Sequence, residues 1–361
     1  MLLFLFRRIG LMLVTAFCLT LIVFTLTNLP AKLETLAKTQ AGSRMTDEEV
    51  ERWIVNNGYG TPMLQRYGEW LGVLPGWTRE EADGTIRGRC VDRHEDPQRA
   101  GTRCGILQGD WGFSTRFREE VATVVGARLG ATGLLMMWVL IVMIPMALIV
   151  GVLAGVREGS RMDRSLSTFA IASTATPEYV SGVVLIALLA SSTIGLSPLL
   201  VGWGWIEGPV LFQGNARSAL DDITLSNFTL PVLTVALYGM GYIARITRAS
   251  MTEVMTQQYI RTARLKGVSF PAIVMRHALR NALIAPFTVI MLQIPWLLNG
   301  VVITEVLFSY PGFGWTLYEA AVNNDIELLL ASSVVAVVVV LVTQLISDIG
   351  YVYLNPRIRI S

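Results

Sequence analysis

A basic stretch from Gln258 to Leu283 holds the side chains best suited to binding another charged molecule. Within it, Gly267 can take a left-handed conformation and end a helix, while Ser269 and Pro271 suit the start of the next helix. The pattern therefore predicts a helix, a tight turn and a second helix. The cationic side chains of this stretch are Arg261, Arg264, Lys266, Arg276 and Arg280.

One side of this stretch, and of the residues just before it, is apolar. The apolar positions recur at helical spacing at Met251, Val254, Met255, Tyr259 and Ala263. A short helix with such a face docks into a groove on a partner protein in many complexes. An interfacial helix lying on anionic lipid has the same pattern, so the residues alone leave both readings open.

A single carboxylate, Glu178, stands at the start of a long apolar run, directly after Pro177. A carboxylate at membrane depth is costly and therefore faces a cavity or a partner. It either lines a translocation path and attracts an amine, or forms a structural pair, or lies near the surface at the end of a shorter helix. Pro177 is expected to kink the chain beside it.

A second polar set lies in a later apolar block. Gln293, Trp296 and Asn299 recur at a spacing of three residues. On one helix they form a polar and aromatic stripe, which either faces a pore or makes hydrogen bonds between helices. Together with Pro177 and Glu178, they are the candidate residues of a translocation path.

The residues that enzymes and metal sites need form no constellation in this sequence. The two histidines, His94 and His277, fall on opposite sides of a membrane in the expected topology. There is no H-E-x-x-H motif and no G-x-x-x-x-G-K-[ST] phosphate loop. A loose G-x-G-x-x-A match at Gly239 falls in an apolar helix and indicates close packing. We therefore expect a chain without enzymatic activity that binds no metal, nucleotide, other cofactor or nucleic acid.

The three cysteines divide into one and two. Cys18 falls in the first apolar run, where it is expected to pack as a small side chain. Cys90 and Cys104 fall in a segment expected outside the membrane, where an oxidising compartment would favour a disulfide. Two free thiols are the alternative. No C-x-x-C pair indicates a redox or zinc site.

The elements that must position these residues are long apolar helices. Of the 361 residues 53% are hydrophobic, and they gather in uncharged blocks long enough for the ~20 residues that a helix needs to cross the hydrocarbon. In lipid the backbone must satisfy its own hydrogen bonds, so the blocks are expected to be helical. The sequence therefore predicts an all-α membrane protein with about six transmembrane helices. The uncharged blocks are 9–31, 129–156, 179–206, 223–244, 281–304 and 328–347.

Charge orients these helices. Basic residues gather in the loops that follow even-numbered crossings and at both ends of the chain, while the short loops on the other side hold only Arg217. This bias predicts a multi-pass protein with both termini in the cytoplasm. The basic residues outside the stretch described above are Arg7, Arg8, Arg157, Arg161, Arg164, Arg245, Arg248, Arg357 and Arg359.

Three parts follow from this topology. Residues 1–29 carry the N-terminus and a first helix, which is retained because its apolar run is too long for a signal peptide and lacks a clear cleavage site. Residues 30–128 form an insertion outside the membrane. Residues 129–361 form a five-helix core with a cytoplasmic segment at 249–280. The expected spans are 9–29, 129–155, 166–194, 228–248, 281–303 and 329–353, and a compact outer loop at 305–327 joins the last two.

Local signals refine this outline. Thr46 followed by three acidic residues predicts the capped start of a helix in the insertion. Residues 75–105 are rich in Gly, Arg and Asp and indicate a loop. Two pairs of glycines four residues apart predict close helix packing near the second span. These pairs are Gly126 with Gly130 and Gly151 with Gly155.

The basic stretch resembles the EAA loop of ATP-binding-cassette (ABC) importer permeases, especially the dipeptide, oligopeptide and nickel permease family. From Tyr259 it reads Y-I-R-T-A-R-L-K-G and then R-H-A-L-R-N-A-L, close to the family form. Two further stretches fall in family order: G-D-W-G-F-S from Gly109 and E-V-L-F-S-Y-P-G-F-G from Glu305. The resemblance covers most of the chain except about residues 30–100.

The resemblance implies a type I ABC importer permease of the bacterial inner membrane that forms half of a pore with a homologous second permease. A coupling helix from Tyr259 to Gly267 would dock on one of two cytoplasmic ATPase subunits, which hold the ATP and Mg. A periplasmic substrate-binding protein would deliver peptides or similar small solutes. The implied coupling residues are Tyr259, Arg261, Thr262, Ala263, Arg264, Lys266 and Gly267.

The sequence departs from the family pattern in two places. The 30–128 insertion is longer than such permeases usually need, so it either docks the binding protein or caps the outer gate. After Asp325 the chain reads I-E-L-L-L, where the family suggests an aspartate, an aromatic residue and a proline.

The cargo is open at this point. A permease of the same build would carry a nickel chelate, a glycoside or an opine-like compound equally well. A membrane-embedded enzyme or a scaffold without transport is the remaining alternative, although the first needs clustered His, Asp or Glu and the second does not need the basic segment.

Overall fold

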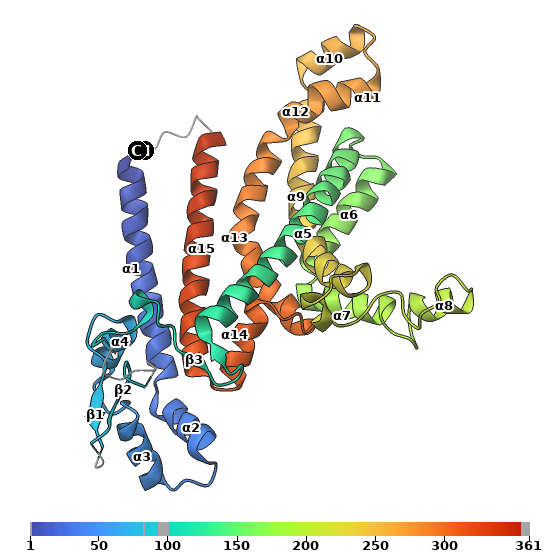
Figure 1. Cartoon of the computed structure of the whole chain (residues 1–361). Helices are drawn as coiled ribbons and strands as arrows, with labels where there is room; N and C mark the ends of the chain where they lie inside the picture. Colours follow the sequence, from blue (N-terminus) through green and yellow to red (C-terminus); the bar gives the residue numbers. More distant parts are fainter. Residues whose placement is uncertain (1, 82–83, 93–100, 355–361) are drawn as a thin grey trace. The chain divides into compact units, whose positions relative to one another are not determined.

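The computed structural model describes residues 2–81, 84–92 and 101–354 (Figure 1). The chain divides into two compact units. The N-terminal unit comprises Met1–Arg128 and Thr316–Leu341, so it holds the first long helix, the predicted insertion and part of the last long helix. The helical unit comprises Leu129–Trp315 and Val342–Ser361.

The N-terminal unit is built mainly from short helices after one long apolar helix. Its helices are α1 (Leu2–Thr27), α2 (Pro30–Ala41), α3 (Asp47–Asn56) and α4 (Met63–Leu71). Its shorter elements are β1 (Thr78–Glu80), β2 (Ile86–Gly88), the 3-10 turn η2 (Ile106–Gln108), β3 (Phe113–Ser114) and β4 (Glu119–Glu120).

The prediction that residues 75–105 form only loop was wrong in one part. β1 and β2 pair antiparallel there, with Thr78 opposite Gly88 and Glu80 opposite Ile86. Strands of three residues are too short to show the alternation that identifies a strand in sequence. This hairpin and the β3–β4 pair are also the exceptions to the predicted all-α fold among the described residues.

An aromatic core holds the N-terminal unit together. Phe24, Tyr67 and Trp70 are each at most 5% exposed and lie in mutual ring contact, with centroids 5.3–5.8 Å apart. Leu33 and Leu36 of α2 and Ile326 and Leu330 of α15 complete this cluster. Because α1, α2, α4 and α15 all contribute, this core joins the N-terminal helices to the first turns of the last long helix.

The predicted helix start at Thr46 is confirmed. Thr46 is the N-cap of α3, and its hydroxyl accepts a hydrogen bond from the Glu49 backbone N–H. The Glu49 carboxylate in turn accepts one from the Thr46 backbone N–H at 2.8 Å. This reciprocal capping box satisfies two backbone donors that a helix start leaves open.

The helical unit holds most of the long helices. The chain enters it through α5 (Val121–Val156), followed by α6 (Arg161–Ala175), α7 (Glu178–Leu189), α8 (Leu196–Gly202), the 3-10 turn η3 (Arg217–Leu220) and α9 (Leu225–Met255). It continues with α10 (Gln258–Leu265), α11 (Phe270–Ala272), the π-helical turn η4 (Ile273–Ala278), α12 (Leu279–Ala282) and α13 (Ile284–Leu307). The chain then passes through α14 (Phe313–Val322), most of which belongs to the N-terminal unit, and α15 (Ile326–Leu354), which belongs to the helical unit from Val342 onward.

Small residues bring α5 and α9 close together, as the glycine spacing predicted. A Cβ built on Gly151 would lie 2.5 Å from the Ala244 carbonyl oxygen, and one on Gly155 2.6 Å from the Met251 Cβ. Gly239 similarly faces Met143 of α5, which confirms close packing at the G-x-G-x-x-A match. The prediction was wrong for Gly126 and Gly130, since both face open space among the described residues.

In the described part of the chain, four helices are long and apolar enough to cross a membrane by themselves: Phe6–Thr27 of α1, α5, α9 and Ile326–Gly350 of α15. Two bent pairs raise the number to six if each pair counts as one span. The predicted span 166–194 is therefore not a single straight helix, whereas the predicted span 281–303 lies mostly in α13 and is bent only at its start. The first is broken into α6 and α7 with a 110° bend, and the second bends by 52° between the segments Phe270–Ala282 and Ile284–Leu297.

Candidate functional site

The basic hairpin, defined here as residues 258–282, projects from one end of the helical unit (Figure 1). Helix α10 ends at Leu265, and Gly267 follows with a φ of +73°. That left-handed conformation favours glycine, and it confirms the predicted turn. The chain then runs back through α11, η4 and α12 to α13.

The charged side chains of α10 point away from its packed face. Arg261, Arg264 and Lys266 are exposed, and Leu265 at the tip is 81% exposed. Tyr259, Thr262 and Gly267 are exposed as well. All seven residues expected to contact an ATPase thus lie on one hairpin. Six of them are exposed, and Ala263 is buried.

The inner face of α10 packs onto the ends of neighbouring helices. Ile260 and Ala263 belong to a buried cluster with Met251 of α9 and Ile273 of η4. Val152 and Val156 of α5, and other partly buried side chains, pack against this cluster. We call it the coupling core. It fixes the hairpin to α5 and α9.

The predicted apolar face needs correction at one position. Helix α9 continues to Met255, beyond its predicted end at residue 248, and a break at Thr256 separates it from α10. Because of that break, Tyr259 does not continue the α9 face: it is 41% exposed and its hydroxyl accepts a hydrogen bond from Asn281 Nδ2 at 3.0 Å. Periodicity counted across a helix break assigns the wrong face.

The second arm of the basic hairpin, which returns from Gly267 to α13, is helical but irregular. Ser269 precedes α11 as predicted, although its side chain makes no capping hydrogen bond. Ile273–Ala278 then forms a π-helical turn, in which Arg276 and His277 are exposed. Such turns are rare and often lie at functional sites.

Pro177 and Glu178 lie at the sharpest bend of the helical unit. Pro177 is the N-cap residue of α7, directly after α6 ends, and Glu178 is in the first turn. Glu178 Oε2 is buried and has no hydrogen-bond partner among the described residues. A Cβ built on Gly300 of α13 would overlap this carboxylate, so Glu178 lies directly against α13.

The predicted stripe of α13 falls on the same face as that contact. Gly300 follows Trp296 by four residues and Gln293 by seven, which places all three on one side of the helix. Trp296 stacks on Tyr238 of α9, with ring centroids 4.7 Å apart, and Gln293 is half-buried. Asn299 lies in α13, but its side chain is outside the described part of the structure. The structure thus brings Glu178 to the stripe.

Sequence reasoning missed the role of Glu305, which opens the second family stretch. Glu305 is fully buried and accepts hydrogen bonds from Thr132 Oγ1 of α5 and from the Trp315 backbone N–H. Thr132 Oγ1 also accepts from the Phe313 backbone N–H at 2.7 Å, and Tyr310 Oη donates to the Ala131 carbonyl at 2.8 Å. This Glu305 network binds the end of α13 and the following turn to α5.

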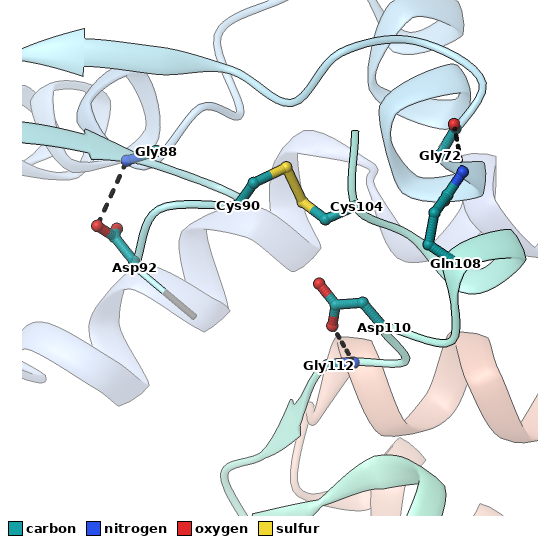
Figure 2. The surroundings of a disulfide bond; sticks show 8 residues. All are labelled: Gly72, Gly88, Cys90, Asp92, Cys104, Gln108, Asp110 and Gly112. Carbon is teal, nitrogen blue, oxygen red and sulfur yellow. Dashed lines mark hydrogen bonds between the residues drawn. A yellow bond between two sulfur atoms is a disulfide. The ribbon is translucent and has the colours of Figure 1, made fainter. Parts of the chain in front are cut away.

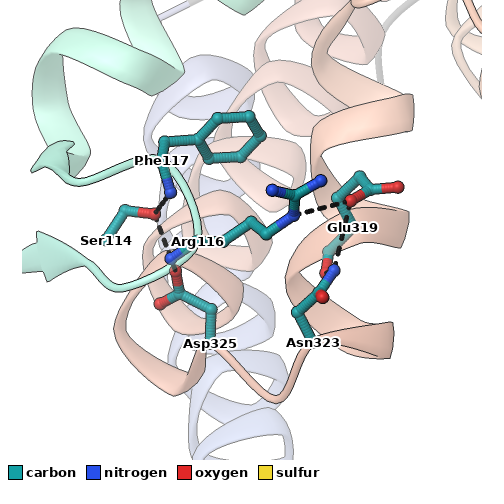
Figure 3. Close-up of polar contacts among 6 residues, drawn as sticks. All are labelled: Ser114, Arg116, Phe117, Glu319, Asn323 and Asp325. Carbon is teal, nitrogen blue, oxygen red and sulfur yellow. Dashed lines mark hydrogen bonds and ion pairs between the residues drawn. The ribbon is translucent and has the colours of Figure 1, made fainter.

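A second buried carboxylate orders the other family stretch, within the N-terminal unit. Asp325 accepts hydrogen bonds from Ser114 Oγ at 2.7 Å and from the Arg116 backbone N–H at 3.1 Å (Figure 3). Its other oxygen accepts from the Leu328 backbone N–H at the start of α15. Arg116 reaches across to Glu319 of α14. This Asp325 network ties the loop before α5 to the start of α15.

Glu327, which departs from the family pattern after Asp325, has a hydrogen-bond partner in the loop before α5. Glu327 Oε2 accepts a hydrogen bond from the Phe113 backbone N–H at 2.9 Å. Gly112 has a φ of +92°, and a Cβ there would overlap the Glu327 carboxylate. The glycine of G-D-W-G-F-S and the unexpected glutamate are therefore matched to each other.

The external cysteines are paired in the structure. Cys90 and Cys104 form a disulfide that closes a loop of sequence separation 14 (Figure 2). Near it, Gln108 Nε2 donates to the Gly72 carbonyl at 3.0 Å, and the Gly112 N–H donates to Asp110 Oδ1 at 3.1 Å. Cys18 is exposed in α1 and unpaired. His94, Arg357 and Arg359 lie outside the described residues.

The long apolar helices and bent pairs define a multi-pass helical membrane protein. The model of the family described as "Binding-protein-dependent transport system inner membrane component" matches residues 147–360, and the chain belongs to this family. The match spans the basic hairpin, the Glu178 bend and Glu305, but not Ala131 and Thr132 of the Glu305 network.

Two peptide permeases agree with this assignment. The dipeptide transport system permease protein DppB of Haemophilus influenzae is 32% identical over 70% of this chain and 78% of its own length. The di/tripeptide transport system permease protein DppB of Pseudomonas aeruginosa is 31% identical over 99% of both chains. A crystal structure of an amino acid ABC transporter with histidines aligns with 64% of this chain and 94% of its own, with a TM-score of 0.45 and 15% identity.

Proposed function

We propose that this chain is a permease subunit of an ATP-driven importer and forms half of the transmembrane pathway for peptides. Family membership supports the class of transporter, and the named activities of the two DppB relatives support peptides as the cargo. A permease of the same build that carries a non-peptide solute is the second candidate. Because the match to the Pseudomonas di/tripeptide permease covers 99% of both chains, peptides are the favoured cargo.

The observation that carries this proposal is the basic hairpin. The inward-facing apolar side chains of α10, Ile260 and Ala263, are occupied by the coupling core, and its cationic side chains are exposed together with Leu265 at the tip. A helix that only rested on lipid would turn apolar side chains outward along its length. The hairpin instead offers Arg261, Arg264 and Lys266 to a partner, and we infer that this partner is a cytoplasmic ATPase subunit.

The proposed assembly contains separate chains for each task. A homologous permease completes the pore, two ATPase subunits hold ATP and Mg, and a periplasmic binding protein supplies the cargo. The chain itself contributes no phosphate loop, so hydrolysis belongs to its partners.

The topology of the proposal places both termini and the basic hairpin in the cytoplasm of a bacterial cell. The excess of arginine in those loops supports this orientation. The insertion at 30–128 then lies in the periplasm, and the Cys90–Cys104 disulfide supports that compartment because disulfides persist where the environment is oxidising.

The proposed pathway runs past Glu178 and the stripe of α13. A half-exposed carboxylate with one buried, unpartnered oxygen suits the amino group of a peptide. Gln293 and Trp296 lie on the face of α13 that meets it. Pro177 fixes the bend from which Glu178 points, and Asn299 is expected to extend the stripe.

Coupling is tested by reversing charge on the hairpin. The assembled complex with Arg261→Glu and Arg264→Glu should lose the rise in ATP hydrolysis that loaded binding protein produces. The matched control is Arg44→Glu with Arg52→Glu, which makes the same charge change at two exposed sites of the N-terminal unit. Full stimulation in the hairpin variant, measured in nanodiscs, would remove the coupling role. Failure of the chain to co-purify with any ATPase would remove the transporter assignment.

The pathway role is tested by Glu178→Gln, which keeps the shape of the side chain and removes its charge. Uptake of a dipeptide with a free amino terminus should fall, while an N-acetylated dipeptide should be affected less. Unchanged uptake kinetics for both would return Glu178 to a structural role. Mass spectrometry of the molecule that the cognate binding protein carries separates peptides from other cargo.

A further inference from the structure

The carboxylate of Asp163, at the start of α6, is saturated with hydrogen-bond donors. Asp163 is only 3% exposed. Arg248 of α9 donates to both of its oxygens, from Nε at 2.5 Å and from Nη2 at 2.8 Å. The Gly159 N–H donates at 2.8 Å and the Ser167 hydroxyl at 3.1 Å. We call this arrangement the α6–α9 clamp.

Its geometry fixes two helices and one loop together. The fork of an arginine fits a carboxylate with two parallel hydrogen bonds, which sets orientation as well as distance. Gly159, with a φ of +75°, lies in the turn between α5 and α6, so its bond draws that turn to the clamp. Ser160 caps α6 by accepting from the Asp163 N–H. Helices α6 and α9 and the turn after α5 therefore meet at one carboxylate.

The clamp stands close to the coupling core along α9. Arg248 precedes Met251 by three residues, about one helical turn, and Met251 is fully buried in the coupling core. Gly155 of α5 packs against the backbone of Arg248 as well as against Met251. The contacts that hold the basic hairpin and the contacts that hold α6 thus share the same stretch of α9.

The opposite end of α6 leads to the proposed pathway. Helix α6 ends at Ala175, and the chain bends by 110° into α7 at Pro177 and Glu178. Between its two ends, Ala170 and Thr174 of α6 pack against Gly241 of α9. A movement of α9 passed to α6 by the clamp would therefore act on the bend that carries Glu178.

Stability alone does not explain such a pair. Asp163 loses solvation on burial, which offsets part of its attraction to Arg248, and the Arg248 side chain is 31% exposed, so solvent screens the pair. A discrete, directional contact between two rigid helices is what a mechanical connection needs, since coupling between distant sites requires elements with defined alternative positions.

We infer that the α6–α9 clamp transmits the movement of the ATPase-docked hairpin to the Pro177–Glu178 bend, with Asp163 and Arg248 as positioning residues. The inference rests on the proposed function. Without the clamp, α9 and the hairpin would still move with the ATPases, but α6 would follow only through apolar contacts.

The test is the double variant Asp163→Asn with Arg248→Gln in the assembled complex with its ATPases and binding protein. It removes both charges and leaves no unpaired one behind. Basal ATP hydrolysis should persist, whereas the stimulation by loaded binding protein should fall on the order of tenfold, within the usual range of coupling between sites. Arg245→Gln is the matched control, because Arg245 is exposed one turn earlier on α9 and rests on the Tyr242 ring.

Three outcomes decide the inference. Normal stimulation in the double variant overturns it, and loss of stimulation with intact assembly supports it. If the double variant does not assemble, Arg248→Lys decides, because lysine keeps the charge and loses the fork. Reduced stimulation in Arg248→Lys supports the clamp and full stimulation overturns it. A wild-type complex without any stimulation contradicts the proposed function instead, and so is distinguished from failure of the clamp.

Discussion

Each of the two units contains a buried carboxylate that joins segments far apart in the chain, Asp325 in one and Glu305 in the other, and the two act in different surroundings. Asp325 of the N-terminal unit joins loops, in a region that also has a disulfide and an aromatic core. Glu305 of the helical unit joins the end of α13 to α5, and no covalent link supports it among the described residues. The comparison teaches that the loop-rich unit has several independent restraints, whereas the helical unit concentrates its polar restraint in a few side chains.

The largest effect is expected at Glu305, where the comparison is sharpest. Glu305→Ala leaves Thr132 and the Trp315 N–H without their acceptor and opens a cavity, so we expect a loss of about 4 kcal/mol. Glu305→Gln keeps one acceptor oxygen and should lose less. Hydrogen exchange of peptides covering residues 305–315, followed by mass spectrometry in detergent, measures the local loss. Equal protection in the alanine variant and the wild type would contradict the role of the network.

The disulfide comes next. Cys90→Ser with Cys104→Ser opens a loop of about fifteen residues, for which the loss of chain restraint corresponds to about 3 kcal/mol. Limited proteolysis should then cut between residues 90 and 104 sooner, while peptides of the helical unit keep their exchange rates. Cys18→Ser is the matched control, since Cys18 is exposed and unpaired in α1. Loss of protection in both units would break the proposed independence of their restraints.

A smaller effect is expected at Asp325. Asp325→Ala removes the acceptor of the Ser114 hydroxyl and of the Arg116 N–H, and it uncaps α15, which together should cost about 2 kcal/mol. The aromatic core and the disulfide remain, so the unit should stay folded. Asp325→Asn keeps a good capping side chain and should lose only part of this stability. Thermal unfolding followed by tryptophan fluorescence measures the stability of the three proteins, which should fall from the wild type through Asp325→Asn to Asp325→Ala.

The smallest effect concerns the capping box of α3. Two hydrogen bonds from Thr46 lower the pKa of the Glu49 carboxyl from its ordinary value. A group whose pKa is lowered by folding stabilises the fold above its unfolded pKa, and this contribution disappears as the pH falls through the folded pKa. Hydrogen exchange of α3 should therefore accelerate below about pH 4, and Thr46→Ala should weaken that dependence. Glu48→Gln, which leaves the box intact, should not.

Features set by neighbours in the chain were predicted well. The apolar blocks, the left-handed turn at Gly267 and the capped start at Thr46 all depend on residues within a few positions of each other. The packing of glycines depends on a distant helix, and their spacing alone was right at Gly151 and Gly155 and wrong at Gly126 and Gly130. The bend at Pro177 was expected as a kink but proved to be a 110° break. Composition cannot fix such an angle, because it depends on the helices packed on either side.

The polar networks were not predicted, because their members are far apart in the chain. Asp163 and Arg248 are separated by 85 residues, and Thr132 and Glu305 by 173. In the sequence, each of these residues could equally be a solvent-exposed charge in a loop, a hydroxyl bonded within its own helix or a residue of a family motif without a known contact. Only the Glu178 contact was partly foreseen, since a carboxylate at the start of an apolar run demanded a neighbour.

Hydrophobicity and charge along the chain by themselves determined that this is a multi-pass helical membrane protein with a basic hairpin between two of its helices. Those properties add up over neighbouring residues, and their sum decides whether a segment is more stable in water or in lipid. The tertiary structure alone decided that Ala263 faces inward while Arg261 faces out, that Glu178 meets Gly300, and that Asp163 joins α6 to α9. Such contacts depend on how helices approach one another, and no local property of the chain specifies that approach.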